Sequence, residues 1–300
     1  MKSVITTLAM LLTVWLPVLS SALPTYRIVT SGNIPQGEPG AIKRYAVTSS
    51  ALNGEVIVDV WLPEGYNDDT SKSYPVVYAH DGQNLFDPAF SFAGVAWEMD
   101  QAAQSLANDG QTEAPIIVGI NNRGTLRPCD YFPEKALDYI AEFDRSKTKI
   151  FETCSGGFFG DEEALFVARE LKPLIDHLFR TNPNASHTFA IGSSMGGLAA
   201  RQIAIDHGYS VQNGTLKTYD ADGADHNEWF WQQRVKLPLG FLLDKDAMNT
   251  GIDAVTIQSS DTDGAYISLS GLIYTTQHPS SLPSGIYIYN RRKLMIGSSQ

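Results

Sequence analysis

After its first 22 residues, the chain begins with hydrophobic and polar positions that alternate with a period of two. Three such stretches, at 26–30, 41–47 and 55–63, are separated by turn residues and by no helical pattern. A period of two is typical of a strand with one face toward water, and short connections join antiparallel neighbours. The pattern therefore predicts that the N-terminal part of the fold is an antiparallel portion of a β-sheet.

From residue 74 onward the apolar runs become continuous and alternate with helical patterns. The runs at 74–79, 115–120 and 187–190 are apolar along most of their length, whereas 97–108 and 162–180 have helical spacing. Continuous apolar strands between helices are typical of a parallel sheet that is buried on both faces. The expected fold class is therefore α/β, with antiparallel strands first and parallel strands after them.

Residues 191–197, Ile-Gly-Ser-Ser-Met-Gly-Gly, lie between the last of these apolar strands and the next helical segment. Ser194 has Gly192 two positions before it and Gly196 two positions after it, a pattern that Ser193 lacks. Small residues at these positions tolerate a strained turn, which lifts the central hydroxyl clear of the sheet edge. We therefore predict that Ser194 is a nucleophile, with a glycine- and serine-rich loop without chemistry as the alternative.

The loop after the first parallel strand begins with His80, Asp81 and Gly82. The carboxyl ends of parallel strands gather at one edge, so this loop is expected to face the same crevice as the serine. Gly82 allows the backbone to turn its amides toward that crevice. We predict an oxyanion hole from the N–H groups of Gln83 and Met195. A metal pair at the histidine and aspartate is less favoured, because no third ligand has suitable spacing, and neither residue needs to be catalytic.

A general base is expected after the serine in the chain, and three histidines follow it. His207 would lie near the end of the helix that begins at the serine, facing away from it, and His278 lies in an apparent tail. His226 lies in a loop between the strand-like stretch 216–219 and the amphipathic stretch 230–243. We therefore predict that His226 is the base.

The acidic stretch 220–225 has a second interpretation as a calcium loop. Its glycine comes too early for such a loop, and the twelfth position is Trp231 where a glutamate would be needed. The sequence therefore favours a loop that carries the base, and we expect a site without metal or other cofactor.

Five segments between residues 50 and 245 carry a family resemblance. They are 74–86 (YPVVYAHDGQNLF), 130–136 (DYFPEKA), 170–182 (ELKPLIDHLFRTN), 190–198 (AIGSSMGGL) and 225–231 (DHNEWFW). Together they resemble the putative-esterase family of α/β-hydrolases, which includes enterochelin esterases, esterase D and the feruloyl and acetyl-xylan esterases of carbohydrate esterase family one. The resemblance implies hydrolysis of a carboxylic ester through an acyl-enzyme, with Ser194 as nucleophile, His226 as base, and the Gln83 and Met195 amides as oxyanion hole.

The chain departs from the family pattern in the short interval of 32 residues between Ser194 and His226. A hydrolase of this kind places two further βα units there, at roughly 30 residues each, together with the acidic member of the triad. We therefore expect a sheet that lacks about two βα units. The acid stays unassigned among Asp206, Asp220, Asp222 and Asp225. Because losing the orienting carboxylate costs roughly 10⁴ in turnover, the alternative to an esterase is an impaired relative that binds an ester or glycan without turnover.

The N-terminal residues indicate export, and export bears on how the two cysteines are interpreted. Residues 1–22 contain Lys2, an apolar run and small residues before a cleavage site near Ala22, which is typical of a signal peptide. No later segment is a membrane-span candidate, so a secreted or cell-surface protein is expected. In an oxidising compartment Cys129 and Cys154 could form a disulfide. The net charge of −11 argues against nucleic acid and anionic membranes as partners.

From about residue 246 the composition shifts to Thr, Ser, Asp and Gly, and short alternating stretches at 252–257, 265–274 and 285–296 predict strands. The segments 263–271 and 282–293 resemble the C-terminal sorting domain of type IX secretion substrates. The resemblance implies surface attachment or secretion and contact with the secretion machinery; a small β appendage or a carbohydrate-binding module is the alternative. An exported esterase suits an insoluble substrate such as feruloylated or acetylated plant polysaccharide. The expected parts are a signal peptide (1–22), an α/β-hydrolase domain (23–245) and a small β domain (246–300).

Overall fold

The computed structural model of the chain describes most of residues 23–244 and four short strands near the C-terminus. The described ranges are 23–141, 145, 148–208, 216–219, 223–244, 266–268, 273–274, 285–289 and 292–296. The predicted signal peptide and His278 lie outside these ranges, as do Asp220 and Asp222, and with them part of the possible calcium loop.

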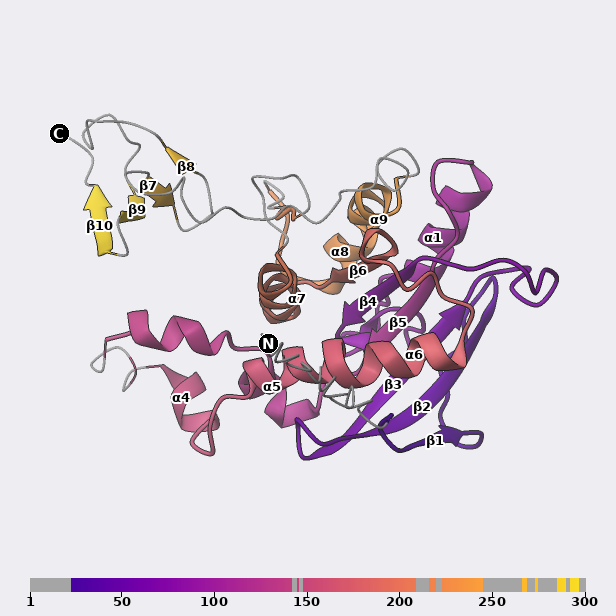
Figure 1. The fold of residues 1–300 in the computed structure, drawn as a ribbon, viewed down its shortest axis with the longest axis horizontal. Coiled ribbons are helices and arrows are strands. Elements are labelled where there is room, and N and C mark those ends of the chain that lie inside the picture. The colour runs from indigo at the N-terminus through magenta and orange to yellow at the C-terminus, as the bar shows by residue number, and fades with distance from the viewer. Residues whose placement is uncertain are drawn as a thin grey trace, which may run out of the picture.

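A six-stranded mixed sheet lies at the centre of the described fold (Figure 1), with the strand order β1-β2-β3-β5-β4-β6. The strands are β1 (Tyr26–Val29), β2 (Ala41–Ser49), β3 (Gly54–Leu62), β4 (Val76–His80), β5 (Ile116–Ile120) and β6 (Thr188–Ile191). β1, β2, β3 and β5 pair antiparallel, whereas β4 pairs parallel with both β5 and β6. The predicted α/β class, with antiparallel strands before parallel ones, is confirmed.

Burial of the sheet follows the hydrophobic pattern of the sequence. Every residue of β4 and β5 is buried, as their continuous apolar runs predict. Successive side chains point to opposite faces of a strand, so Ile116 and Val118 join one apolar cluster while Ile117 joins the other. The sheet therefore separates two cores, and each core needs its own layer of helices.

Helices cover both faces of the sheet (Figure 1). The α-helices are α1 (Met99–Asn108), α2 (Arg127–Asp130), α4 (Lys149–Thr153), α5 (Gly160–Leu165), α6 (Lys172–Leu178), α7 (Met195–Asp206), α8 (Glu228–Arg234) and α9 (Lys236–Leu242). Shorter segments are η1 (Gly82–Asn84), η2 (Gly124–Leu126), η3 (Glu134–Tyr139), the π-helical η4 (Phe166–Leu171) and η5 (Ala185–His187). Apolar side chains of η4 and α6 pack on one core, and those of α1 and α9 pack on the other.

The helix predicted over 162–180 is divided into α5, η4 and α6. Pro173 lies in the first turn of α6. Proline has no N–H, and its ring conflicts with the carbonyl four residues earlier. The wider π-helical turn immediately before α6 is therefore a local response to the proline.

The sheet ends at β6, which is an edge strand among the described residues. All four of its residues are partly exposed. The strand predicted at 216–219 is wrong, because these residues have no regular structure. A strand needs a hydrogen-bonded neighbour, and local alternation of side chains does not supply one. None of the described residues between α7 and His226 belongs to a strand, in agreement with the expected shortening of the sheet.

The C-terminal strands form a second, four-stranded antiparallel sheet in the order β10-β9-β7-β8. They are β7 (Tyr266–Ser268), β8 (Ile273–Tyr274), β9 (Gly285–Tyr289) and β10 (Arg292–Ile296). The strand predicted at 252–257 lies outside the described residues. Across the described part of the chain, no helix combines the length and the apolar character needed to cross a membrane.

Candidate active site

Ser194 occupies a strained turn between β6 and α7. Its backbone angles are φ 55° and ψ −129°, which are unusual for a residue other than glycine. A Cβ on Gly192 would overlap the carbonyl oxygen of Gly196, and a Cβ on Gly196 would lie 2.9 Å from a carboxylate oxygen of Asp81. Both glycines are therefore required by close packing of the turn, and this packing presents the serine hydroxyl at the start of α7.

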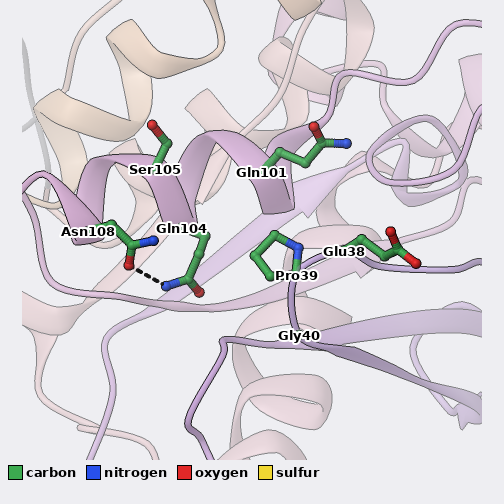
Figure 2. A pocket seen from close by; sticks show the side chains of 7 residues that line it. All are labelled: Glu38, Pro39, Gly40, Gln101, Gln104, Ser105 and Asn108. Atoms are coloured by element: carbon green, nitrogen blue, oxygen red, sulfur yellow. Dashed lines mark hydrogen bonds between the residues drawn. The ribbon is translucent and has the colours of Figure 1, made fainter.

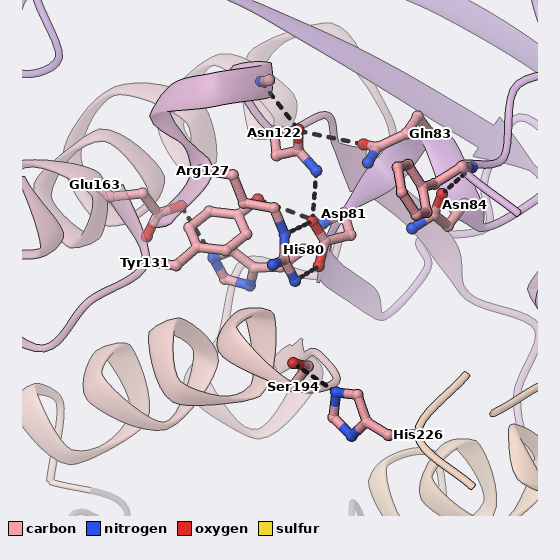
Figure 3. A network of polar contacts seen from close by, with 12 residues as sticks. His80, Asp81, Gln83, Asn84, Asn122, Arg127, Tyr131, Glu163, Ser194 and His226 are labelled. Atoms are coloured by element: carbon pink, nitrogen blue, oxygen red, sulfur yellow. Dashed lines mark hydrogen bonds and ion pairs between the residues drawn. The ribbon is translucent and has the colours of Figure 1, made fainter. Parts of the chain in front are cut away.

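The structure brings Ser194 and His226 together, although only a short chain separates them. The Oγ of Ser194 lies 2.8 Å from the Nε2 of His226, within hydrogen-bond distance (Figure 3). The histidine is exposed and immediately precedes Asn227, whose side chain accepts a hydrogen bond from the N–H of Phe230 and caps α8. The nucleophile is thus fixed by the start of α7, and the base by the start of α8.

Besides its contact with Ser194, the His226 ring contacts the ring of Trp231. The two rings are nearly perpendicular, at 86° and with centroids 5.1 Å apart. Within the described part of the chain, no carboxylate forms a hydrogen bond with His226. Asp206, one of the predicted acids, instead forms an ion pair with Lys135 at 2.6 Å. The acidic member of a triad therefore stays unassigned.

The predicted oxyanion loop forms η1 directly after β4. Gly82 packs so tightly that a Cβ there would lie 2.5 Å from the side-chain oxygen of Asn121. The side-chain oxygen of Gln83 accepts a hydrogen bond from the N–H of Asn122, at 3.2 Å. Met195 is the first residue of α7. The structure therefore places Gln83 and Met195 after neighbouring parallel strands, and their role as oxyanion donors stays a prediction.

Asp81 and Arg127 form an ion pair that the sequence analysis did not predict. The Nε and Nη2 of Arg127 donate to the two carboxylate oxygens of Asp81, at 2.6 and 2.7 Å, and Asn122 donates to the same carboxylate at 2.7 Å (Figure 3). The hydrogen bond to Asp81 raises the pKa of Arg127. The guanidinium also lies over the ring of Tyr131, 5.5 Å from its centroid. Since a carboxylate oxygen of Asp81 abuts Gly196, this ion pair adjoins the turn that carries the nucleophile through its carboxylate.

His80 and Glu163 form a buried pair at the end of β4. The Nε2 of His80 lies 2.9 Å from a carboxylate oxygen of Glu163, and the imidazole is fully buried against the ring of Tyr131. Burial lowers the pKa of His80, but the Glu163 carboxylate and the charge of Asp81 raise it more, and the net shift is upward. The pair connects the end of β4 to α5, so its position indicates a structural role.

Cys129 and Cys154 form a disulfide, with their Cα atoms 5.4 Å apart. The bond connects α2, which carries Arg127, to the end of α4. The backbone N–H of Phe159 also donates to the carbonyl oxygen of Cys129, at 2.9 Å. The segment that supplies the guanidinium is therefore held in place by covalent and backbone contacts as well as by its ion pair.

Two polar cavities lie along α1, and neither is lined by Ser194 or His226. The first has a volume of about 590 Å³, and Figure 2 shows Gln104 and Asn108 of α1 facing the turn around Pro39. The Nε2 of Gln104 donates to the side-chain oxygen of Asn108, at 2.9 Å. The second cavity shares these two residues. These two cavities therefore lie apart from the turn that carries Ser194.

Comparison with known proteins gives one family match. The model of a family described as Esterase, Putative esterase, matches residues 49–216, which is more than half of the chain. This match contains Ser194 and ends before His226. No curated protein matches the chain.

Several solved structures are similar to part of the chain. An IroE-like serine hydrolase from Shewanella oneidensis is 27% identical over 56% of this chain and 47% of its own, with a TM-score of 0.44. The BES protein from Bacillus cereus is 19% identical over 60% of this chain and 63% of its own, with a TM-score of 0.42. A CE1 ferulic acid esterase from Anaeromyces mucronatus is 18% identical over 58% of this chain and 56% of its own, with a TM-score of 0.39. The chain thus spans less than two thirds of the length of each.

Proposed function

The chain belongs to the putative-esterase family, and from this premise we propose that it hydrolyses carboxylic esters through an acyl-enzyme on Ser194. The observation that carries the proposal is the 2.8 Å contact between the Oγ of Ser194 and the Nε2 of His226, at a strained turn between β6 and α7. A hydroxyl at a strand-to-helix turn and an imidazole within hydrogen-bond distance are the two groups that acyl transfer needs first.

In the proposed reaction, His226 accepts the hydroxyl proton while the Oγ of Ser194 attacks the ester carbonyl carbon. The tetrahedral intermediate collapses, the alcohol leaves with the proton from His226, and the acyl group stays on the serine. His226 then removes a proton from water, which attacks the acyl-enzyme. The acid is released as the serine recovers its proton.

Two kinds of group can stabilise the negative oxygen of the intermediate. The amides of Gln83 and Met195 follow the ends of β4 and β6. The guanidinium of Arg127 is paired with the Asp81 carboxylate, which abuts Gly196 in the turn after Ser194. Removing one donor of this kind typically costs roughly 10²–10³ in turnover. We propose that the amides bind the oxygen and that Arg127 contributes its charge.

A second candidate function is ester or glycan binding with little turnover. His226 is exposed, and within the described residues it has no carboxylate partner. Water around an exposed base weakens electrostatic stabilisation of the transition state, and the orienting acid of a triad supplies roughly 10⁴ in turnover. These observations favour a slow enzyme over a fast one.

For the substrate and location we propose feruloyl or acetyl groups on plant polysaccharide and a secreted or cell-surface enzyme. The support comes from the sequence: the signal-like residues 1–22, the sorting-type tail after residue 246, and the resemblance to carbohydrate esterases. Mass determination of the mature N-terminus tests export. Release of ferulate or acetate from esterified xylan tests the substrate, and the absence of both products at any enzyme concentration would exclude it.

Covalent labelling separates the two candidate functions. The purified chain is incubated with a fluorophosphonate, and its intact mass and the labelled peptide are followed with time. An esterase is expected to gain one adduct on Ser194, Ser194→Ala is expected to gain none, and Ser193→Ala is the matched control that keeps wild-type labelling. An unlabelled wild-type chain that still binds an ester ligand would favour the binding protein.

A further inference from the structure

The imidazole of His226 contacts the ring of Trp231, which in turn contacts the ring of Trp97. Trp231 meets His226 at 86° with centroids 5.1 Å apart, and it meets Trp97 at 69° with centroids 5.5 Å apart. Trp97 is only 3% exposed and belongs to the apolar cluster under the sheet. An exposed imidazole therefore rests, through one intermediate ring, on a part of the core that cannot move freely.

We propose that Trp231 is a positioning residue for His226, which holds the imidazole in the orientation in which Nε2 faces Ser194. A hydrogen bond at Nε2 alone fixes one atom of the ring and leaves its plane free to swing. A perpendicular aromatic contact fixes the plane, because rings prefer edge-to-face geometry. In a triad the acid orients the ring from its other nitrogen; among the described residues, the contact that can orient the imidazole plane is that with Trp231. The inference rests on the proposed hydrolase function.

The start of α8 fixes the distance between the two rings. The side chain of Asn227 caps the helix, and the carbonyl oxygen of Asn227 accepts a hydrogen bond from the N–H of Trp231, at 3.3 Å. Trp231 thus lies one turn beyond the residue that follows His226. Movement of the backbone beside His226 relative to that of Trp231 would require the first turn of α8 to unwind, so only side-chain rotation is left for the ring contact to restrain.

The same ring contacts connect the base to the predicted oxyanion loop. The backbone N–H of Trp97 donates to the carbonyl oxygen of Asn84, the last residue of η1, at 2.8 Å. Gln83 is the residue before Asn84. The contacts through Trp231 and Trp97 therefore connect the base to the loop that carries Gln83, one of the two predicted oxyanion donors.

The experiment compares Trp231→Leu with Trp231→Phe in the full chain. The leucine removes the aromatic ring, whereas the phenylalanine keeps a ring that can contact the imidazole edge to face. Two other variants are controls. Trp229→Leu removes an exposed tryptophan from the same helix, whose described ring contact is with Phe230, and Trp61→Phe changes a fully buried tryptophan of the same core. Each variant is assayed for the rate of fluorophosphonate labelling, for kcat and KM with p-nitrophenyl acetate, and for urea unfolding.

We expect Trp231→Leu to slow labelling and to lower kcat by about tenfold with KM changed less than twofold. A tenfold loss corresponds to about 1.4 kcal/mol, the upper range for one aromatic contact. Trp231→Phe is expected to recover at least half of the wild-type rate. Trp229→Leu should keep the wild-type rate, and Trp61→Phe should lose stability without losing the labelling rate of its folded fraction.

Failure of the inference differs from failure of the proposed function. If wild type is labelled and Trp231→Leu is labelled within twofold of its rate, Trp231 does not position the base. The same conclusion follows if Trp231→Leu and Trp231→Phe lose equal activity, because a ring is then not what matters. If wild type itself is neither labelled nor active, the hydrolase proposal is overturned, and the positioning role is overturned with it.

Discussion

Gly192→Ala tests whether close packing of the turn, and not only the presence of a serine, makes the site. Gly192 has no positive φ, so alanine suits its own backbone. Its Cβ would lie 2.2 Å from the carbonyl oxygen and 2.3 Å from the carbonyl carbon of Gly196. Both are backbone atoms, which cannot rotate aside as a side chain can. The end of β6 and the start of α7 must therefore separate.

The size of the effect follows from this geometry. Real Cβ atoms are essentially never found closer than 3.0 Å to such neighbours, so the two segments must move apart by about 0.8 Å. A misplacement of about 1 Å at reacting atoms costs roughly 10²-fold in rate. We expect Gly192→Ala to lower the rate of Ser194 labelling by about 100-fold. The unfolding free energy should fall by only about 1–3 kcal/mol, as for other overpacked sites.

The assay is the time course of fluorophosphonate labelling, measured with urea unfolding on the same preparations. Gly240→Ala is the matched control, because Gly240 lies in α9 and a Cβ there meets no atom within 4 Å. It should keep the wild-type labelling rate and gain about 0.5–1 kcal/mol of stability, since alanine favours a helix interior. Labelling of a folded Gly192→Ala within threefold of wild type would refute the idea that contact between these two glycines sets the geometry.

Three further predictions concern charge and covalent structure. Burial raises the pKa of Asp100 to about 6 from its usual 3.8; the folded protein therefore holds the proton more tightly than the unfolded chain, and stability falls as the pH rises from about 4 to about 6. Asp100→Asn should raise the unfolding free energy at pH 7 by up to about 3 kcal/mol and change it little at pH 4, in urea titrations at both values. Replacing Cys129 and Cys154 by serine should cost about 3 kcal/mol in the same assay, and a change below about 0.5 kcal/mol would contradict the chain-entropy argument. Arg127→Ala should lower kcat about 100-fold, whereas Arg123→Ala, which also removes a bidentate ion pair with a buried aspartate, should lower it less than threefold; equal losses would show that only stability is affected.

The elements that sequence patterns predicted correctly are those set by local chemistry. The apolar runs at 74–79 and 115–120 and the helical stretch at 97–108 match β4, β5 and α1 to within two residues. Burial on both faces requires a continuous apolar strand, so the pattern is strong in a single sequence. The turn at Ser194 was predictable from another local feature, because only small residues fit the close contact between Gly192 and Gly196.

Pairings between distant side chains could not be predicted in this way. The partners Asp81 and Arg127 are 46 residues apart, and no periodicity relates them. A signal was present, since Arg127 follows a parallel strand whose carboxyl end borders that of β4. The wrong prediction at 216–219 has the converse cause: its alternation is a local feature, whereas a strand exists only where a neighbouring strand offers hydrogen bonds.

The shortened sheet changes how the base is positioned. Asp81 and Ser194 follow the ends of β4 and β6, so the sheet holds each of them from its N-terminal side. The described residues between α7 and His226 form no strand that leads into the histidine. It is held from its C-terminal side by the cap of α8 and the ring of Trp231. The base and the nucleophile therefore depend on different parts of the core. Damage to the packing of α8 should misplace the imidazole while Asp81 and Ser194 keep their geometry, and damage to β6 should do the reverse.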